Sequence, residues 1–255
     1  MSAISLNNIS KVFPNGTRAL DGLNLDVRQG EFLSLLGPSG CGKSTVLRIV
    51  SGLMEPSHGS VKLTGGSTSK HSDDLGFVFQ EPTLMPWSSA FGNVWLPLRL
   101  KGLSKRIARD QVMNALEMVG LEDFADHAPH ELSGGMKMRV SIARALVTRP
   151  KVLLMDEPFA ALDEITRFKL NNDLLELWST FCWTVVFVTH SVYESVYLSN
   201  RIVVMASNPG RIAADKKIDA SYPRGNDFRG SVAYQKHCQD ISGTLLSAID
   251  FEGAL

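Results

Sequence analysis

The sequence predicts an α/β protein with an antiparallel β subdomain at its N-terminus and an inserted α-helical subdomain. Short apolar runs typical of buried strands occur before residue 80 and again after residue 150. A glycine-rich loop joins one of these runs to a segment of helical spacing. No strand pattern appears between about residues 80 and 150, where Lys105 to Val119 is expected to form an amphipathic helix.

Composition excludes several classes of protein. The chain has 255 residues, enough for a large core with a subdomain, and its 26 basic residues balance its 26 acidic ones. This neutral charge does not favour a nucleic-acid partner. No apolar run approaches the length of a membrane span, and the first residues do not resemble a signal peptide. Three scattered cysteines (Cys41, Cys182, Cys238) indicate a reduced, cytosolic protein without a cysteine metal site.

The N-terminal region is expected to be antiparallel. Alternating strands are predicted at residues 4–13, 23–27 and 59–64. A turn is expected at residues 14–16 and a polar loop from Gly65 to Asp74. Phe13 ends the first strand, where it could stack on an adenine ring or be an ordinary core or edge residue, and periodicity leaves both readings open.

The central motif fits the phosphate-loop pattern G-x-x-x-x-G-K-[ST]. An apolar strand at residues 31–36 precedes it, and helical spacing follows at residues 46–50. Such a loop presents free backbone N–H groups and the positive end of a helix dipole to phosphates. Lys43 is expected to reach the terminal phosphates, and the Ser44 hydroxyl to hold Mg²⁺. Cys41 is interpreted as a small loop filler rather than a nucleophile. The motif consists of Gly37, Pro38, Ser39, Gly40, Cys41, Gly42, Lys43, Ser44 and Thr45.

Three further buried strands each deliver polar side chains at their carboxyl ends, where ligands of open parallel sheets bind. These strands are predicted at residues 75–79, 152–155 and 184–188. Gln80 follows the first and could coordinate Mg²⁺ or orient a water. Asp156 and Glu157 follow the second, the former as a Mg²⁺ ligand and the latter as the group that polarises the attacking water. His190 follows the third and is a candidate contact of the terminal phosphate.

Three helix starts carry groups that could bind an anion or cap the helix. Ser133, with Gly134 and Gly135, begins a helix and is either a phosphate-receiving terminus or a plain N-cap. Asp163 precedes a helix predicted at residues 164–181, where it could be no more than an N-cap. Residues 191–194 match a capping box.

The segment after Gln80 combines three prolines and two tryptophans with other apolar residues. It is a poor continuous core helix. Its apolar residues either pack a small core of their own or form a docking surface for a partner. Closing strands are predicted at residues 202–205 and 211–218, and from Ser221 the chain becomes polar and then weakly helical up to Ile249.

The chain resembles the nucleotide-binding subunit of ABC transporters through motifs that stand in that family's order. These are the phosphate loop, Gln80, Leu132-Ser-Gly-Gly, Leu-Leu-Met-Asp-Glu157, Ala-Leu-Asp163 and His190. The resemblance covers residues 1–220, and residues 80–87 and 93–98 look like the ATPase subunits of nitrate/sulfonate/taurine-type importers. It implies an ABC ATPase domain at 1–225, with a P-loop NTPase (RecA-like) core at 1–80 and 150–225. The domain includes a helical subdomain at about 81–149. A helical tail at 226–255 is expected to follow the domain.

The resemblance implies a mechanism. Two copies form a head-to-tail homodimer around two ATP molecules, so that the phosphate loop of one copy and the Ser-Gly-Gly segment of the other hold each nucleotide. Hydrolysis opens the dimer and drives import of a small nitrate/sulfonate/taurine-like oxyanion through separate membrane permease subunits. These permeases would dock near residues 82–98, and an extracytoplasmic solute-binding protein would act indirectly. The subunit is expected as a peripheral protein on the cytoplasmic face of the bacterial inner membrane.

Motifs and resemblance together give the expected site. The catalytic residues are Glu157, His190 and Gln80, and the Mg²⁺ ligands are Ser44, Gln80 and Asp156. The ATP-binding residues are Phe13, Gly37 to Thr45, Ser133, Gly134, Gly135 and Asp163.

Two positions depart from the family pattern. Phe13 stands where Tyr is usual, and Met136 stands where the signature usually has Gln. Gln at that position would complete a capping box by returning to the N-cap N–H, a bond that Met136 cannot make. We therefore expect a slightly looser start of this helix, with phosphate contacts left to Ser133 and the N–H groups of the two glycines.

A non-transport ABC ATPase, acting in cofactor assembly or in a membrane complex, is the alternative function. DNA-repair members carry a long coiled-coil insertion, for which the spacing from Gly42 to Ser133 leaves no room. A small P-loop kinase or switch protein would not need the Ser-Gly-Gly segment or His190. The proline- and tryptophan-rich segment after Gln80 favours the importer by resemblance.

Overall fold

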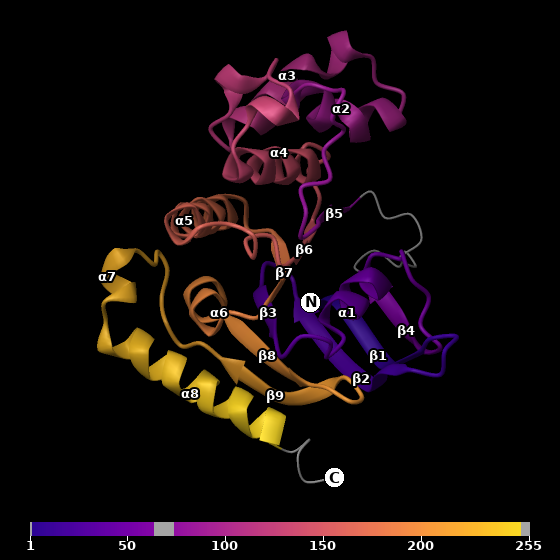
Figure 1. Cartoon of the computed structure of the whole chain (residues 1–255), viewed down its shortest axis with the longest axis vertical. Coiled ribbons are helices and arrows are strands. Elements are labelled where there is room, and N and C mark those ends of the chain that lie inside the picture. The colour runs from indigo at the N-terminus through magenta and orange to yellow at the C-terminus, as the bar shows by residue number, and fades with distance from the viewer. Residues whose placement is uncertain (1, 64–73, 251–255) are drawn as a thin grey trace. The chain divides into compact units, whose positions relative to one another are not determined.

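The computed structural model describes residues 2–63 and 74–250. Its chain packs as two compact units. Unit 1 combines residues 2–63 with residues 178–250, and unit 2 comprises residues 74–177. Figure 1 traces the chain from the N-terminal strands to the C-terminal helix. The expected polar loop at residues 65–74 lies, except for its last residue, outside the described residues.

An antiparallel sheet begins unit 1. It consists of β1 (Ser2–Val12), β2 (Arg18–Arg28) and β4 (His58–Leu63), in the order β2-β1-β4. Buried and exposed residues alternate along β2, as expected for a strand with one solvated face. The predicted turn is present, since the N–H of Gly16 donates to the C=O of Phe13 at 2.9 Å. The predicted antiparallel β subdomain is therefore confirmed.

A second set of strands in unit 1 carries the phosphate loop. β7 (Thr184–Thr189), β3 (Phe32–Leu36), β8 (Arg201–Ala206) and β9 (Arg211–Lys217) are neighbours in that order. β3 is parallel to β7 and β8, and β9 is antiparallel to β8. Every residue of β3 and β7 is buried, which explains their almost continuous apolar runs. Leu36 is in register with Thr189, so the segments after β3 and β7 start at the same edge.

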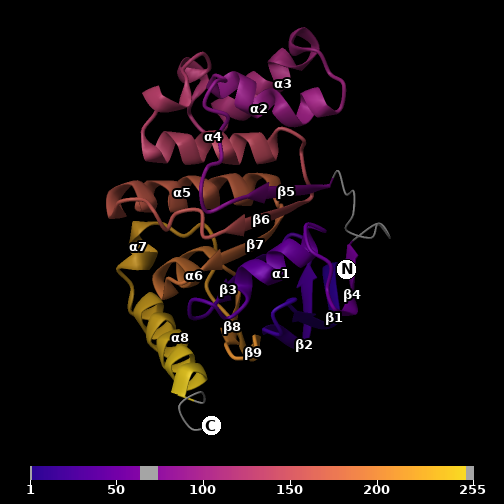
Figure 2. The ribbon, with the colours of Figure 1, turned by 45° about the vertical axis from the view of Figure 1, so that its right-hand side comes forward.

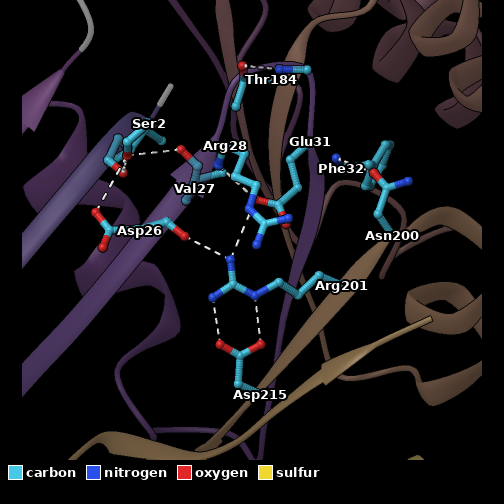
Figure 3. Close-up of polar contacts among 12 residues, drawn as sticks. Ser2, Asp26, Val27, Arg28, Glu31, Phe32, Thr184, Asn200, Arg201 and Asp215 are labelled. Atoms are coloured by element: carbon cyan, nitrogen blue, oxygen red, sulfur yellow. Dashed lines mark hydrogen bonds and ion pairs between the residues drawn. The ribbon is translucent and has the colours of Figure 1, made fainter. Parts of the chain in front are cut away.

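Polar side chains fix the point where β3 begins (Figure 3). Arg201 donates through Nε to Asp215 at 2.6 Å, and its Nη1 lies 3.5 Å from the Glu31 carboxylate. The hydrogen bond to Asp215 is the main cause that raises the pKa of Arg201. Asn200 and Thr184 accept hydrogen bonds from main-chain N–H groups at and just before the start of β3. The strand that leads into the phosphate loop is thus held to both of its neighbours.

Unit 2 contains two parallel strands and a helical insertion. The strands are β5 (Leu75–Val78) and β6 (Val152–Asp156). Between them the chain forms α2 (Ala90–Leu100), α3 (Lys105–Glu117), α4 (Gly134–Leu146) and the 3-10 turns η2 (Glu122–Phe124) and η3 (Pro129–Glu131). α2 packs on α3 and α4 (Figure 2). No described residue between 80 and 150 forms a strand, as predicted. α5 (Glu164–Phe181) has the predicted bounds.

The proline-rich segment forms a small core, one of the two alternatives that the sequence left open, and its role as a docking surface stays a prediction. α2 is a continuous helix that contains Pro97, so the expectation of a poor helix is wrong from Ala90 onward. Phe91, Val94 and other apolar residues of α2 are buried, which offsets the loss of one helix hydrogen bond at the proline. Trp87, which precedes α2, is 82 % exposed. The helix supplies a small core, and the loop before it presents a tryptophan to solvent.

The C-terminal tail packs on unit 1. α7 (Asn226–Arg229) and α8 (Val232–Asp250) follow β9, and α8 packs against β8, β9 and α6 (Val192–Leu198) (Figure 1). Arg224 is buried and its Nη1 donates, at 3.0 Å in each case, to three carbonyl groups at the end of α6. These carbonyls belong to Val196, Tyr197 and Ser199. The cation therefore satisfies carbonyls that a helix terminus leaves without partners.

We expect Arg224→Met to lower the free energy of unfolding by about 2–4 kcal/mol, because it leaves several buried carbonyl groups unpaired. Urea denaturation measures the effect. Lys236→Met, which removes a cation from the exposed face of α8, is the matched control and should change stability by less than about 0.5 kcal/mol. Equal effects of the two substitutions would contradict the anchoring role of Arg224.

Candidate nucleotide site

The phosphate loop runs from the end of β3 at Leu36 to α1 (Lys43–Val50). Gly42 and Gly37 show why its backbone requires glycine. Gly42 has a φ of 94°, and a Cβ on Gly37 would lie 2.6 Å from the main-chain oxygen of Met205. Gly42 is the N-cap of α1, and no side chain caps this helix start. An N-cap without a side-chain acceptor suits a helix start that binds an anion through its main-chain N–H groups.

The Lys43 ammonium lies inside this loop. Lys43 is only 4 % exposed, and its Nζ donates to the carbonyl groups of Gly37 (2.8 Å) and Pro38 (2.9 Å). The cation is thus held at the beginning of the loop, directly after β3. Cys41 is fully buried, and burial raises the pKa of its thiol. A buried neutral thiol supports the interpretation of Cys41 as a loop filler.

Other residues of the loop differ in their exposure to solvent. Ser39 and Gly40 are exposed, whereas Ser44 and Thr45, in the first turn of α1, are half-buried.

Phe13 is also half-buried and lies just beyond the end of β1, where Lys11 Nζ is 5.8 Å from its ring centroid. Phe13 is therefore not a core residue, and adenine stacking stays a prediction.

His190 follows β7 directly and its side chain is exposed. Because Thr189 is in register with Leu36, His190 and Gly37 follow equivalent positions of adjacent parallel strands. Unit 1 therefore brings the phosphate loop and His190 to the same edge of its sheet.

Unit 2 brings Gln80 and the acidic pair to one edge in the same way. Val78 ends β5 in register with Met155, and Asp156 is the last residue of β6. Asp156 is buried, whereas Glu157 is half-buried and has a φ of 46°. A non-glycine residue in the left-handed region stores strain of about 1–3 kcal/mol, which is typical of functional sites.

Ser133 is the N-cap of α4, and its Oγ accepts a hydrogen bond from the Met136 N–H at 3.3 Å. Ser133 and Gly134 are exposed, whereas Gly135 is buried against Thr166. A Cβ on Gly135 would lie 2.6 Å from Thr166 Cγ2, so the close packing of this helix start requires glycine. The capping role of Ser133 is confirmed, and its role as a phosphate contact stays a prediction.

Asp163 also caps a helix. Its Oδ1 accepts from the Thr166 N–H at 2.9 Å, and this main-chain hydrogen bond lowers the pKa of Asp163. The N-cap reading of Asp163 is therefore confirmed, while a nucleotide contact stays a prediction.

Met136→Gln tests the expected looseness of the α4 start. Gln can return to the Ser133 N–H and complete the capping box, which is worth about 0.5–1 kcal/mol of stability. We expect a higher melting temperature together with stronger ATP-driven dimerisation. Calorimetry and size-exclusion chromatography measure these effects, and unchanged dimerisation and turnover would remove the idea.

Sequence reasoning missed the groups that hold the segment after Gln80. Arg144, on α4, donates to the C=O groups of Pro82 and Thr83, both at 2.8 Å. Asn93 is fully buried; its Oδ1 accepts from the Met85 N–H at 2.7 Å, and its Nδ2 donates to main-chain carbonyls of the same segment. An arginine and an asparagine on helices give no local sequence signal for such bonds.

Comparison with known proteins decides the family. The profile described as ABC transporter matches residues 20–160. An uncharacterized ABC transporter ATP-binding protein of Methanocaldococcus jannaschii is 48% identical over 93% of this chain and 90% of its own length. The chain belongs to the ABC transporter ATP-binding family. It is thus an ABC ATPase subunit of a transporter.

Other relatives of this ABC ATPase carry more specific names. An aliphatic sulfonates import ATP-binding protein of Bacillus cereus (strain ZK / E33L) is 39% identical over 99% of this chain and 98% of its own length. A dimeric structure described as a bacterial ABC transporter cassette has a TM-score of 0.75 and 37% identity. It covers 86% of this chain and 100% of its own. The same cassette has also been solved with ADP and Pi in a post-hydrolysis state, with 36% identity. The predicted P-loop NTPase fold class is confirmed.

No helix among residues 2–63 and 74–250 is both long and apolar enough to cross a membrane. Within the same residues, no group of three or more His, Cys, Asp and Glu side chains could hold a metal ion. Only one of the expected Mg²⁺ ligands, Asp156, belongs to those residue types, so the expected set stays a prediction.

Proposed function

We propose that this ABC ATPase powers a small-solute importer as a head-to-tail homodimer that encloses two ATP molecules. The observation that carries the proposal is the presence of two different glycine-bearing helix starts in one chain, Gly42 before α1 and Ser133 before α4. The first has no side-chain cap, and the second has an exposed serine whose O–H proton is not used in its capping bond. A dimeric cassette among the similar structures supports the pairing of one start in cis with the other in trans.

Lys43 and the N–H groups at the start of α1 would bind the β- and γ-phosphates in cis. Ser133 and the N–H groups of Gly134 and Gly135 would bind the γ-phosphate from the other copy, with Asp163 beside them. Glu157 would accept a proton from the attacking water. The imidazole of His190 would hold the γ-phosphate in line with that water.

Ser44, Gln80 and Asp156 would hold Mg²⁺. They offer a hydroxyl, an amide and a carboxylate oxygen, and Mg²⁺ prefers such hard ligands while it keeps waters and substrate phosphates in its shell. β5 ends at Val78 and β6 ends at Asp156, and the two strands are parallel neighbours. Gln80 and Asp156 therefore lie at the same edge of unit 2, which suits this role. Bound Mg²⁺ would neutralise charge that develops on the phosphates.

The importer assignment draws on relatives named for aliphatic sulfonate import, which match along almost their whole length. The solute would be a sulfonate-like oxyanion, delivered by an extracytoplasmic solute-binding protein. Separate permease subunits would dock near residues 82–98, where Trp87 is exposed on a segment held by Arg144 and Asn93. The chain would then work on the cytoplasmic face of the bacterial inner membrane.

Reconstitution tests this function. Membrane subunits that copurify with the tagged chain are placed in proteoliposomes, and ATP-dependent uptake of a short alkanesulfonate is compared with uptake of nitrate and of a neutral sugar. We expect uptake of the sulfonate that exceeds both others. ATP hydrolysis without uptake of any oxyanion would contradict the importer assignment, while the ATPase itself would stand.

A further inference from the structure

The residues on either side of His190 are joined to one another by hydrogen bonds. Thr189 Oγ1 donates to Glu194 Oε2 at 2.6 Å and accepts from the Ser191 N–H at 3.0 Å. Ser191 Oγ in turn accepts from the Glu194 N–H at 3.3 Å. Thr189, Ser191 and Glu194 form what we term the His190 clamp.

The His190 clamp differs from the capping box that the sequence predicts. In a capping box, the carboxylate three residues into the helix accepts directly from the N-cap N–H. Here the Thr189 hydroxyl lies between the two groups, since it accepts from the Ser191 N–H and donates its own proton to Glu194. The serine half of the prediction is confirmed, and the glutamate half is wrong. The relay ties the residue before His190 to the residue after it.

Burial makes these bonds difficult to exchange for water. Thr189 is 2 % exposed and Glu194 is 9 % exposed, whereas His190 between them is exposed. A buried hydroxyl bonded to a carboxylate at 2.6 Å is a strong hydrogen bond, and loss of either partner leaves the other unpaired in the interior. The opposite end of α6 is held by Arg224. The His190 side chain therefore projects from main chain that is fixed on both sides.

We propose that Glu194 is a positioning residue for His190, and that it acts through the Thr189 hydroxyl. The inference rests on the proposed function, in which His190 contacts the γ-phosphate. Nothing in this role requires Glu194 to touch the nucleotide. Without the clamp, the main chain at residues 189–191 gains freedom and the imidazole loses its alignment with the phosphate. A misplacement of about 1 Å at a reacting group lowers turnover by up to about 100-fold.

Matched substitutions test the proposal. Glu194→Ala and Thr189→Val remove the bond, whereas Glu194→Gln and Thr189→Ser keep an acceptor and a hydroxyl in place. We expect kcat for ATP hydrolysis to fall about 10–100-fold in the first pair, with KM for ATP changed less than about 2-fold. The second pair should remain within about 3-fold of the wild-type kcat. A Glu194→Gln chain as impaired as Glu194→Ala would overturn the proposal.

A double-mutant cycle separates positioning from plain destabilisation. In a His190→Ala background, Glu194→Ala should lower kcat by less than about 2-fold, because the group that it positions is already absent. Arg224→Met, at the far end of α6, is the control. It should lower the stability of the chain. If it also lowers kcat slightly, it should lower kcat by the same factor in the wild-type and the His190→Ala backgrounds. If Glu194→Ala lowers kcat by the same factor with and without His190, the two residues act independently and the proposed role of Glu194 is overturned.

A readout that does not depend on turnover completes the test. In NMR spectra of the histidine-labelled chain, Glu194→Ala should shift and broaden the His190 ring signals and leave those of the other histidines unchanged. Unchanged His190 signals would overturn the clamp. A wild-type chain without ATPase activity would instead contradict the proposed function, and the histidine signals would still decide whether the clamp fixes His190.

Discussion

Glu157→Gln is expected to bind ATP and to hydrolyse it about 10²–10⁴-fold more slowly than the wild-type chain. Glutamine has nearly the same shape, so the strained backbone at φ 46° and the buried neighbour Asp156 keep their places. The amide cannot accept a proton from water, which is the role proposed for Glu157. Single-turnover hydrolysis and nucleotide binding, measured on the same preparation, separate the two steps.

Glu164→Gln is the matched control for this prediction. Glu164 is an exposed carboxylate in the first turn of α5, seven positions further along the chain. Its replacement removes the same charge and should leave turnover within about 2-fold. Near-wild-type turnover in the Glu157→Gln chain would contradict the assignment of Glu157 as the general base.

Lys43→Ala is expected to weaken ATP binding by about 100-fold or more. Lys43 is buried, and it is the one basic residue of the phosphate loop at residues 37–45. Loss of a buried charge that pairs with a phosphate costs about 2–5 kcal/mol of binding free energy. Isothermal titration calorimetry with Mg-ATP measures the change.

Arg48→Ala supplies the comparison on the same helix. Arg48 is an exposed cation in the last turn of α1, away from the phosphate loop. It should change ATP affinity less than about 2-fold, while stability falls by a few tenths of a kcal/mol. If Lys43→Ala and Arg48→Ala weaken binding equally, only the net charge of the helix matters and the loop assignment is wrong.

The parts of the fold that the sequence predicts are those with local causes. β3 and β7 are buried over their whole length and read as continuous apolar runs, and α5 has the predicted bounds. The phosphate loop is recognisable because glycine is required where φ is positive or the backbone has no room for a Cβ, as at Gly42 and Gly37. Asp163 and Ser133 cap helices as expected, because caps depend on neighbours three residues away.

The arginine contacts that the sequence did not reveal join residues far apart in the chain. Arg144 bonds to main chain 61 and 62 residues before it, and Arg224 bonds to carbonyls 25–28 residues before it. Neither arginine has a carboxylate partner among these bonds, so charge patterning does not reveal it. Pro97 lies inside α2 because burial of one helix face outweighs the cost of the proline. The relay through Thr189 escaped the capping-box pattern because the pattern begins two residues later, at Ser191.

In the proposed dimer, each ATP site is built from residues of two chains. Measuring the ATPase activity of a mixture of two inactive variants tests this claim most directly. Lys43→Ala disables the phosphate loop, and Ser133→Arg blocks the exposed start of α4. In a head-to-tail dimer, a mixed pair contains one site built from the intact loop of one copy and the intact Ser-Gly-Gly segment of the other.

Each variant alone should hydrolyse almost no ATP. An equal mixture should recover about a quarter of wild-type activity, since half of randomly formed dimers are mixed and each has one intact site of two. No recovery in a mixture shown to contain mixed dimers, or full activity of either variant alone, would contradict the two-chain site.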